Sequence, residues 1–471
     1  MLPTESLSRD AARVRPSNRS FAYLLLLSAP LAAIAPACGD DDDATDYNAE
    51  PAWLGAPTET LLAGQGRSLR VAFTPEDPEG DALTVRLEGP EGVALEHDAE
   101  AQELVVRASY GVTGTIDVKV ALEDGTNPAV EYVLRIDVAE LGWTDLVSWP
   151  AGSAPEAREH ASVVVDDASG SAYVLFGSGY APYLSGLGDG ARFDVATKSW
   201  SPVTMTGDVP LPGGSKRFAG ARGTGAGYLH GGYVDGGPTG PDTLHRVAVQ
   251  GDTVSYTEIA QSTTRPSARS LHVFAYDPGS DTFMMFGGVG VGLLDDTWTM
   301  RIVDGVAEWT ELELDVRPPG RFGAFYGVDE ERGRLVLYSG QTGSALRMGD
   351  DVWVFDFRSD PPRWTELQLP ATPPGRRNGT SVWDPAGEQL FVFGGTSDGM
   401  TTQPGLYALD ARPGREAWSE VVRAGEPELR SSGFGAFVAG DGELGGAVWM
   451  GFGNSSTGVY RDFSRLGFTP P

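Results

Sequence analysis

The chain has 471 residues, enough for two or three domains with cores of their own, and its formal net charge is −30. So acidic a surface repels phosphates and has no counterions to release from them, which excludes nucleic acid as a partner. The 63 glycines and 33 prolines make up more than a fifth of the residues, a composition typical of many short strands joined by turns.

The N-terminus has the pattern of an export signal. Four arginines between positions 9 and 19 precede the mostly apolar stretch 22–35, which is too short to span a bilayer comfortably. Small residues then lead to Cys38 in "APAC", a motif that resembles the lipobox of bacterial lipoproteins, although Ala35 replaces the usual Leu. An ordinary signal peptide followed by an incidental cysteine is the alternative.

The lipobox resemblance implies that residues 1–37 are removed and that Cys38 becomes a lipidated N-terminus, held in the membrane by its acyl chains alone. Gly39 follows where an Asp would favour the inner membrane, so the resemblance implies an exported protein anchored in the bacterial outer membrane. Because Cys38 is the only cysteine, an intrachain disulfide is excluded. The carboxylate run within 38–50 repels itself and predicts a solvated acidic tether.

Residues 51–139 predict a small antiparallel β-sandwich. Runs with period-2 alternation recur between turns, at 68–73, 82–87, 103–108, 115–122 and 131–138. The acidic turns between them resemble those of bacterial Ig-like and cadherin-like domains, which hold calcium at domain junctions. The resemblance implies calcium as a possible cofactor, with these candidate ligands: Asp77, Glu79, Asp81 and Asp124. Solvated turn residues in a spacer domain are the other interpretation.

From residue 141 onward the sequence repeats. An aromatic residue, Thr or Ser, any residue and an aliphatic residue recur with spacings of 57, 56, 53, 55 and 54 residues, beginning at Trp143, Trp200, Tyr256, Trp309, Trp364 and Trp418. An apolar strand ending in glycine runs in phase, as in "FMMFGG" (283–288). An arginine opens each unit: Arg158, Arg217, Arg269, Arg321, Arg376 and Arg430.

This pattern resembles the kelch repeat over about 330 residues. The resemblance implies a six-bladed β-propeller at 141–468, each blade having four strands around a central channel. The last unit has no aromatic tetrapeptide of its own, whereas one stands before the first unit. We therefore expect residues 143–147 to supply the outer strand of the final blade and to close the ring.

Strand alternation places the arginines and the loops after Gly-Gly at one mouth of the channel. The expected ligand contacts there are the six repeat arginines together with Tyr180, Tyr183, Tyr233 and Arg347. Structural pairing of the arginines with acids or carbonyls of the adjacent blade is the alternative. His160 and His272 are expected to be structural, and "GTSDG" (395–399) lacks the strand-to-helix context of a nucleophile elbow.

These features favour a binding protein of the cell envelope whose partner is a protein or a glycan. The kelch resemblance also admits enzymes. The copper radical oxidases of this kind need a Cys-crosslinked Tyr, which Cys38 cannot supply from outside the propeller. A carbohydrate-active enzyme for sialic or other acidic sugars, using the arginines of the mouth, is the alternative; no catalytic residue is assigned.

Overall fold

The computed structural model describes residues 49–148, 155–179, 186–234, 240–343, 347–421, 426–442, 444–469 and 471. Every secondary-structure element in these ranges is a strand. No helix there is long and apolar enough to cross a membrane. The signal peptide, Cys38, nearly all of the acidic tether, Tyr180 and Tyr183 lie outside the described residues.

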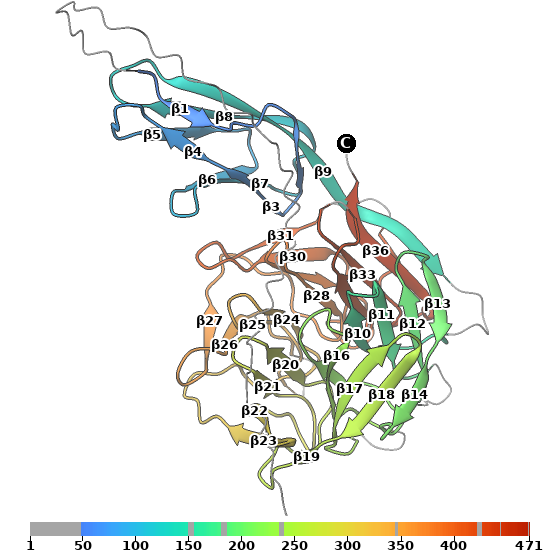
Figure 1. Ribbon diagram of the computed structural model, residues 1–471. Helices are drawn as coiled ribbons and strands as arrows, with labels where there is room; N and C mark the ends of the chain where they lie inside the picture. Colours follow the sequence, from blue (N-terminus) through green and yellow to red (C-terminus); the bar gives the residue numbers. More distant parts are fainter. Residues whose placement is uncertain are drawn as a thin grey trace, which may run out of the picture. The chain divides into compact units, whose positions relative to one another are not determined.

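The N-terminal domain is built from two facing sheets (Figure 1). One contains β5 (Thr84–Glu88), β8 (Gly114–Glu123), the first half of β9 (Val130–Ser148) and β2 (Leu61–Gly64). The other contains β3 (Ser68–Ala72), β7 (Glu103–Ala108) and β6 (Val93–Asp98), while β1 (Ala52–Leu54) pairs with β4 (Thr74–Glu76). Trp53, Phe73 and Val120 belong to its buried core. That the domain is Ig-like or cadherin-like stays a prediction.

The remaining chain forms six blades of four antiparallel strands, which confirms the all-β, six-bladed propeller. The innermost strands neighbour one another in a closed ring. They are β10 (Ser162–Asp166), β15 (Arg217–Ala219), β20 (Val273–Asp277), β24 (Phe325–Asp329), β28 (Thr380–Asp384) and β32 (Phe434–Val438).

The second and third strands of each blade are almost entirely apolar because they are covered by blades on both sides. The second strands are β11 (Ser171–Leu175), β16 (Ala226–His230), β21 (Thr282–Phe286), β25 (Arg334–Tyr338), β29 (Gln389–Phe393) and β33 (Ala447–Gly451). The third strands are β12 (Gly190–Asp194), β17 (Leu244–Gln250), β22 (Thr297–Val303), β26 (Val352–Asp356), β30 (Leu406–Asp410) and β36 (Asp462–Thr469).

The aromatic tetrapeptides lie on the outer strands, which are β13 (Ser199–Pro202), β18 (Thr253–Glu258), β23 (Val306–Glu311), β27 (Arg363–Leu367), β31 (Ala417–Glu420) and the second half of β9. Two short strands, β14 (Thr204–Gly207) and β19 (Ala260–Gln261), add parallel edges to the second and third blades, and β34 (Asn454–Ser455) pairs with β35 (Gly458–Val459) in a hairpin.

Each tetrapeptide aromatic packs against an aromatic ring at the end of the second strand of the preceding blade. The ring pairs, with centroids 4.7–5.9 Å apart, are Trp143–Phe393, Trp200–Phe452, Tyr256–Phe176, Trp309–His230, Trp364–Phe286 and Trp418–Tyr338. Such contacts bury large apolar area between blades. The repeated aromatic therefore joins each blade to its neighbour.

Strand β9 passes from the N-terminal domain into the last blade, where it pairs antiparallel with β36 (Figure 1). Trp143 lies opposite Leu466 and Val147 opposite Phe463. The ring is thus closed by a strand from the start of the propeller chain beside a strand from its end. The domain boundary at 139–141 lies inside this continuous strand.

Trp143→Ala tests the closure. We expect the substitution to lower the free energy of unfolding by about 2–4 kcal/mol, because it removes the ring that packs on Phe393 and leaves a cavity. Leu146→Ala, on the same strand with a 65% exposed side chain, should change it by less than about 0.5 kcal/mol. Urea unfolding of both variants gives the comparison, and equal effects would contradict the closing role of Trp143.

Candidate functional site

Five of the six repeat arginines are buried inside their own blades, with side chains at most 2% exposed: Arg158, Arg269, Arg321, Arg376 and Arg430. In each, Nε donates to the carbonyl two residues earlier and Nη1 donates to a carbonyl at the end of the second strand. In four of them a carboxylate just before the third strand receives the guanidinium: Asp189, Asp296, Asp351 and Asp462.

Arg321 illustrates the arrangement. Its Nη1 and Nη2 each lie 2.7 Å from an oxygen of Asp351, a forked pair that joins the beginning of one strand to the beginning of another. Burial pushes the pKa of Asp351 upward, but the hydrogen bond and charge of Arg321 outweigh it and the pKa is lowered. Arg376 has no such carboxylate; it donates to the Pro404 carbonyl and lies 5.1 Å from the Tyr407 ring centroid.

These five guanidinium groups face their own blades rather than an open channel mouth. The contacts are those of the structural alternative, except that the carboxylates belong to the same blade and not to the adjacent one. A ligand-binding role for the five stays a prediction that this geometry does not favour, because a ligand would have to displace buried ion pairs.

The assignment of Arg217 as the repeat arginine of the second blade is wrong. In the other blades the arginine precedes the inner strand by four residues, whereas Arg217 is itself the first residue of β15, opposite His230. Gly213 occupies the repeat position: its carbonyl accepts the hydrogen bond from Gly177 that the arginine carbonyls accept elsewhere. A Cβ there would lie 1.9 Å from the Tyr233 carbonyl oxygen, so no larger residue fits without a shift.

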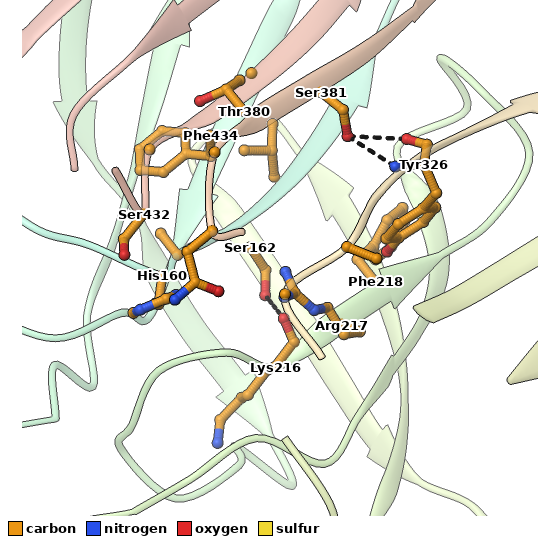
Figure 2. A pocket seen from close by; sticks show the side chains of 18 residues that line it. His160, Ser162, Lys216, Arg217, Phe218, Tyr326, Thr380, Ser381, Ser432 and Phe434 are labelled. Carbon is orange, nitrogen blue, oxygen red and sulfur yellow. Dashed lines mark hydrogen bonds between the residues drawn. The ribbon is translucent and has the colours of Figure 1, made fainter. Parts of the chain in front are cut away.

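The register shift places Arg217 in the central channel. A cavity of about 210 Å³ is lined by residues of the inner strands and of the segments just before them. Arg217 lines it together with His160, Asn378, Thr380 and Ser432 (Figure 2). None of the 18 lining residues is an aspartate or a glutamate. The cavity is therefore polar and basic inside a strongly acidic protein.

Arg217 is the charged group with capacity left in this cavity. Its Nε donates to the His272 carbonyl at 3.0 Å, and no contact to another described residue engages its two Nη groups. Burial, followed by the charges of Arg217 and Arg377, lowers the pKa of His160 to about 3, so its ring is neutral at physiological pH. Lys216 also lines the cavity, but its Nζ lies 5.4 Å from the Phe176 ring centroid, and burial lowers its pKa to about 8.

The tyrosine and arginine candidates on the loops are not brought together. Tyr233 is half-buried and its hydroxyl is hydrogen-bonded to Ser178, while its ring centroid lies 6.2 Å from that of His160. Arg347 is exposed, and its carbonyl accepts a hydrogen bond from the Thr342 amide. Of the two, Tyr233 is the one near the channel.

The calcium candidates cap turns. Asp77 Oδ1 accepts the backbone amides of Glu79 and Asp81, and Asp124 Oδ1 accepts those of Thr126 and Asn127. In the part of the chain that the structure describes, no group of three His, Cys, Asp or Glu side chains is placed to hold a metal ion. Calcium binding by Asp77, Glu79, Asp81 and Asp124 stays a prediction.

Sequence reasoning missed Asn378, Thr380 and Ser432 as channel-lining residues. The signal that locates them is their distance from the repeat arginine: they follow Arg376 or Arg430 by two or four residues, where the chain turns into the inner strand. His160, expected to be structural, lies at the corresponding position after Arg158 and lines the same cavity.

No established protein-family model matches the chain. Among curated proteins it is similar to Adagio protein 3 of Arabidopsis thaliana, with 27% identity over 186 residues, which is 38% of this chain and 30% of that protein. Putative adagio-like protein 2 of Oryza sativa subsp. japonica is 30% identical over 149 residues, 31% of this chain and 23% of that protein. The chain thus spans less than a third of the length of these relatives.

Two solved structures cover most of the chain at low identity. One, titled "Structure of YjhT", has a TM-score of 0.47 and 14% identity, and covers 68% of this chain and 96% of that one. The other is a fungal alcohol oxidase in complex with copper, with a TM-score of 0.46 and 13% identity, covering 70% and 76% of the two chains. The strand order and the repeat markers of the chain itself define its class: a six-bladed kelch-type β-propeller.

Arg321→Ala should behave as a stability variant. We expect a loss of about 3 kcal/mol or more in the free energy of unfolding, because Asp351 is left buried without its partner. Urea unfolding at neutral pH measures it. The difference from the unchanged protein should shrink as the pH falls through the lowered pKa of Asp351, because a protonated carboxyl no longer forms the ion pair.

The matched control is Arg317→Ala, four residues away. Arg317 pairs with Asp295 on the surface, where the two side chains are 40% and 58% exposed, so its loss should cost less than about 1 kcal/mol. Equal effects of the two substitutions would show that the buried pair is not a structural staple.

Proposed function

We propose that this chain is a binding protein whose propeller receives a protein partner on one face. We call this the mouth face: it comprises the loops that follow the second strands and the segments that precede the inner strands. Because the strands of a blade are antiparallel, these segments lie on the same side of the propeller. The proposal rests on where the propeller exposes apolar side chains.

Six of the eight large apolar side chains that are exposed on the described part of the propeller lie on the mouth face. They are Val209, Leu211, Val291, Leu293, Val316 and Met400. Val291 is fully exposed and Met400 is 79% exposed. The other two are Leu146 on β9 and Val303 in the hairpin between β22 and β23, at the opposite side. Exposed apolar side chains gathered on one face are a mark of protein–protein contact surfaces.

The arginine staples support the same proposal. Asp296 and Asp351 end the loops that follow β21 and β25, and each is fixed by a buried arginine of its own blade. The loop bases are thus held while the tips remain accessible, an arrangement that reduces the ordering cost of binding. The neighbouring exposed charges, such as Asp295 and Arg317, form the polar surroundings of the apolar side chains.

A protein is favoured over a glycan because the exposed residues are Val, Leu and Met rather than flat aromatic rings or a row of polar donors. The setting we propose is the cell envelope, reached by export and by lipidation of Cys38. The carbohydrate-active alternative relied on an arginine-lined mouth. With five of those arginines buried in ion pairs or carbonyl contacts, no observation now favours it.

Site-specific photo-crosslinking tests the face. The photoreactive residue p-benzoylphenylalanine is placed in the full chain at Met400, or at Val303 as the control on the opposite side, in cells that produce the protein. We expect a discrete protein adduct from position 400 and none from 303. Val291→Asp should reduce the adduct about fivefold or more, because a charge enters the apolar contact.

Adducts of equal yield from both positions, or adducts unaffected by Val291→Asp, would overturn the mouth face as the binding surface. An adduct that is digested by glycosidases and not by proteases would replace the protein partner with a glycan. Folding of each variant is checked by its urea unfolding midpoint.

A further inference from the structure

The second blade departs from the other five, and its departures gather in the central channel. It has Gly213 where a repeat arginine stands in the others, and its inner strand is the three-residue β15. The first residue of the inner strand is Ser, Val, Phe, Thr and Phe in the other blades but Arg217 here. One blade thus supplies a single arginine at a position that is uncharged around the rest of the ring.

The groups around this arginine have hydrogen-bonding capacity that the described protein does not use. The side-chain amide of Asn378, the hydroxyls of Thr380 and Ser432 and the ring nitrogens of His160 make no hydrogen bond to any described residue, although all four residues line the cavity. The Asn378 Oδ1 atom is buried without a partner. A buried polar group left unmatched costs free energy, so these groups indicate a polar occupant.

The charge of the occupant follows from the cavity wall. Arg217 lines the cavity, where no carboxylate side chain is present to balance it, and its two Nη groups form the outer edge of a planar fork. That fork matches the two oxygens of a carboxylate, with both hydrogen bonds strengthened by charge. The surrounding hydroxyls and amide suit further oxygen atoms of the same molecule.

We propose that the central cavity is a binding site for a small hydroxy-carboxylate, whose carboxylate is held by Arg217 and whose hydroxyl groups meet Asn378, Thr380 and Ser432. The site lies within the ring of inner strands, whereas the mouth face consists of loops. The two proposals are therefore independent, and each can fail without the other.

Calorimetric titration of the full chain tests the site. The probes are glycolate, malate and glucuronate, with glycolamide and glucose as uncharged counterparts and sulfate as a different oxyanion. We expect at least one carboxylate to bind while its uncharged counterpart does not. Arg217→Gln should weaken that binding roughly tenfold or more, because the charged fork is lost and a neutral amide replaces it.

Three variants separate the role of the fork from charge and from folding. Arg217→Lys keeps the charge and should restore only part of the affinity. Thr380→Val should weaken the hydroxylated ligands more than simple carboxylates. Arg265→Gln removes a surface arginine that pairs with Asp242, and should leave binding unchanged.

Binding that persists in folded Arg217→Gln, or no binding of any carboxylate to the unchanged protein, would overturn the proposal. Sulfate binding as tightly as every carboxylate would also overturn it, because the site would then be a general anion site. The photo-crosslinking pattern from Met400 should be the same with and without Arg217→Gln, which keeps the two proposals distinguishable.

Discussion

The propeller depends on one backbone contact repeated at every junction between blades. The amide of the second residue after each second strand, always a glycine, donates to the carbonyl at the repeat position of the next blade: Gly177 to Gly213, Gly232 to Arg269, Gly288 to Arg321, Gly340 to Arg376, Gly395 to Arg430 and Gly453 to Arg158. All six glycines have positive φ. A Cβ on Gly395 would lie 2.7 Å from the Arg377 carbonyl oxygen. Close approach of backbone therefore requires glycine here, and the aromatic and arginine contacts stabilise what this ring positions.

Because the junction is made by backbone atoms, the side chain at the repeat position can change without opening the ring. Gly213 keeps the hydrogen bond from Gly177 although it has no guanidinium to staple its blade. The second blade retains the left-handed residue two positions later, Ser215, as the other blades do at His160 or Asn378. A blade with no repeat arginine is thus tolerated, and its inner strand is where Arg217 enters the channel.

The repeat markers predicted the blades, their order and the outer strand at 143–147 because each marker records a contact that recurs at every junction. The register error at Arg217 had a detectable signal: the other arginines up to Arg376 stand 18 residues before the first residue of the Gly-Gly position, and Arg217 stands 14 before Gly231. The burial of the arginines had none, because a charged residue beside a loop is expected to be exposed until its partner, such as Asp351, is placed in space.

The same limit applies to the link between the two domains, where the sequence predicted a spacer. Strand β9 belongs to a sheet of the N-terminal domain and to the last blade, so neither sheet is complete without it. Arg67 forms a buried ion pair with Asp384 at 3.0 Å, and the Tyr110 hydroxyl donates to Gln389 at 2.5 Å, from partners some 280 to 320 residues away in the chain. A shared strand fixes direction, and the buried polar contacts fix rotation about it. The last blade is therefore completed and held by the N-terminal domain, which acts as part of the propeller's closure rather than as a separate spacer.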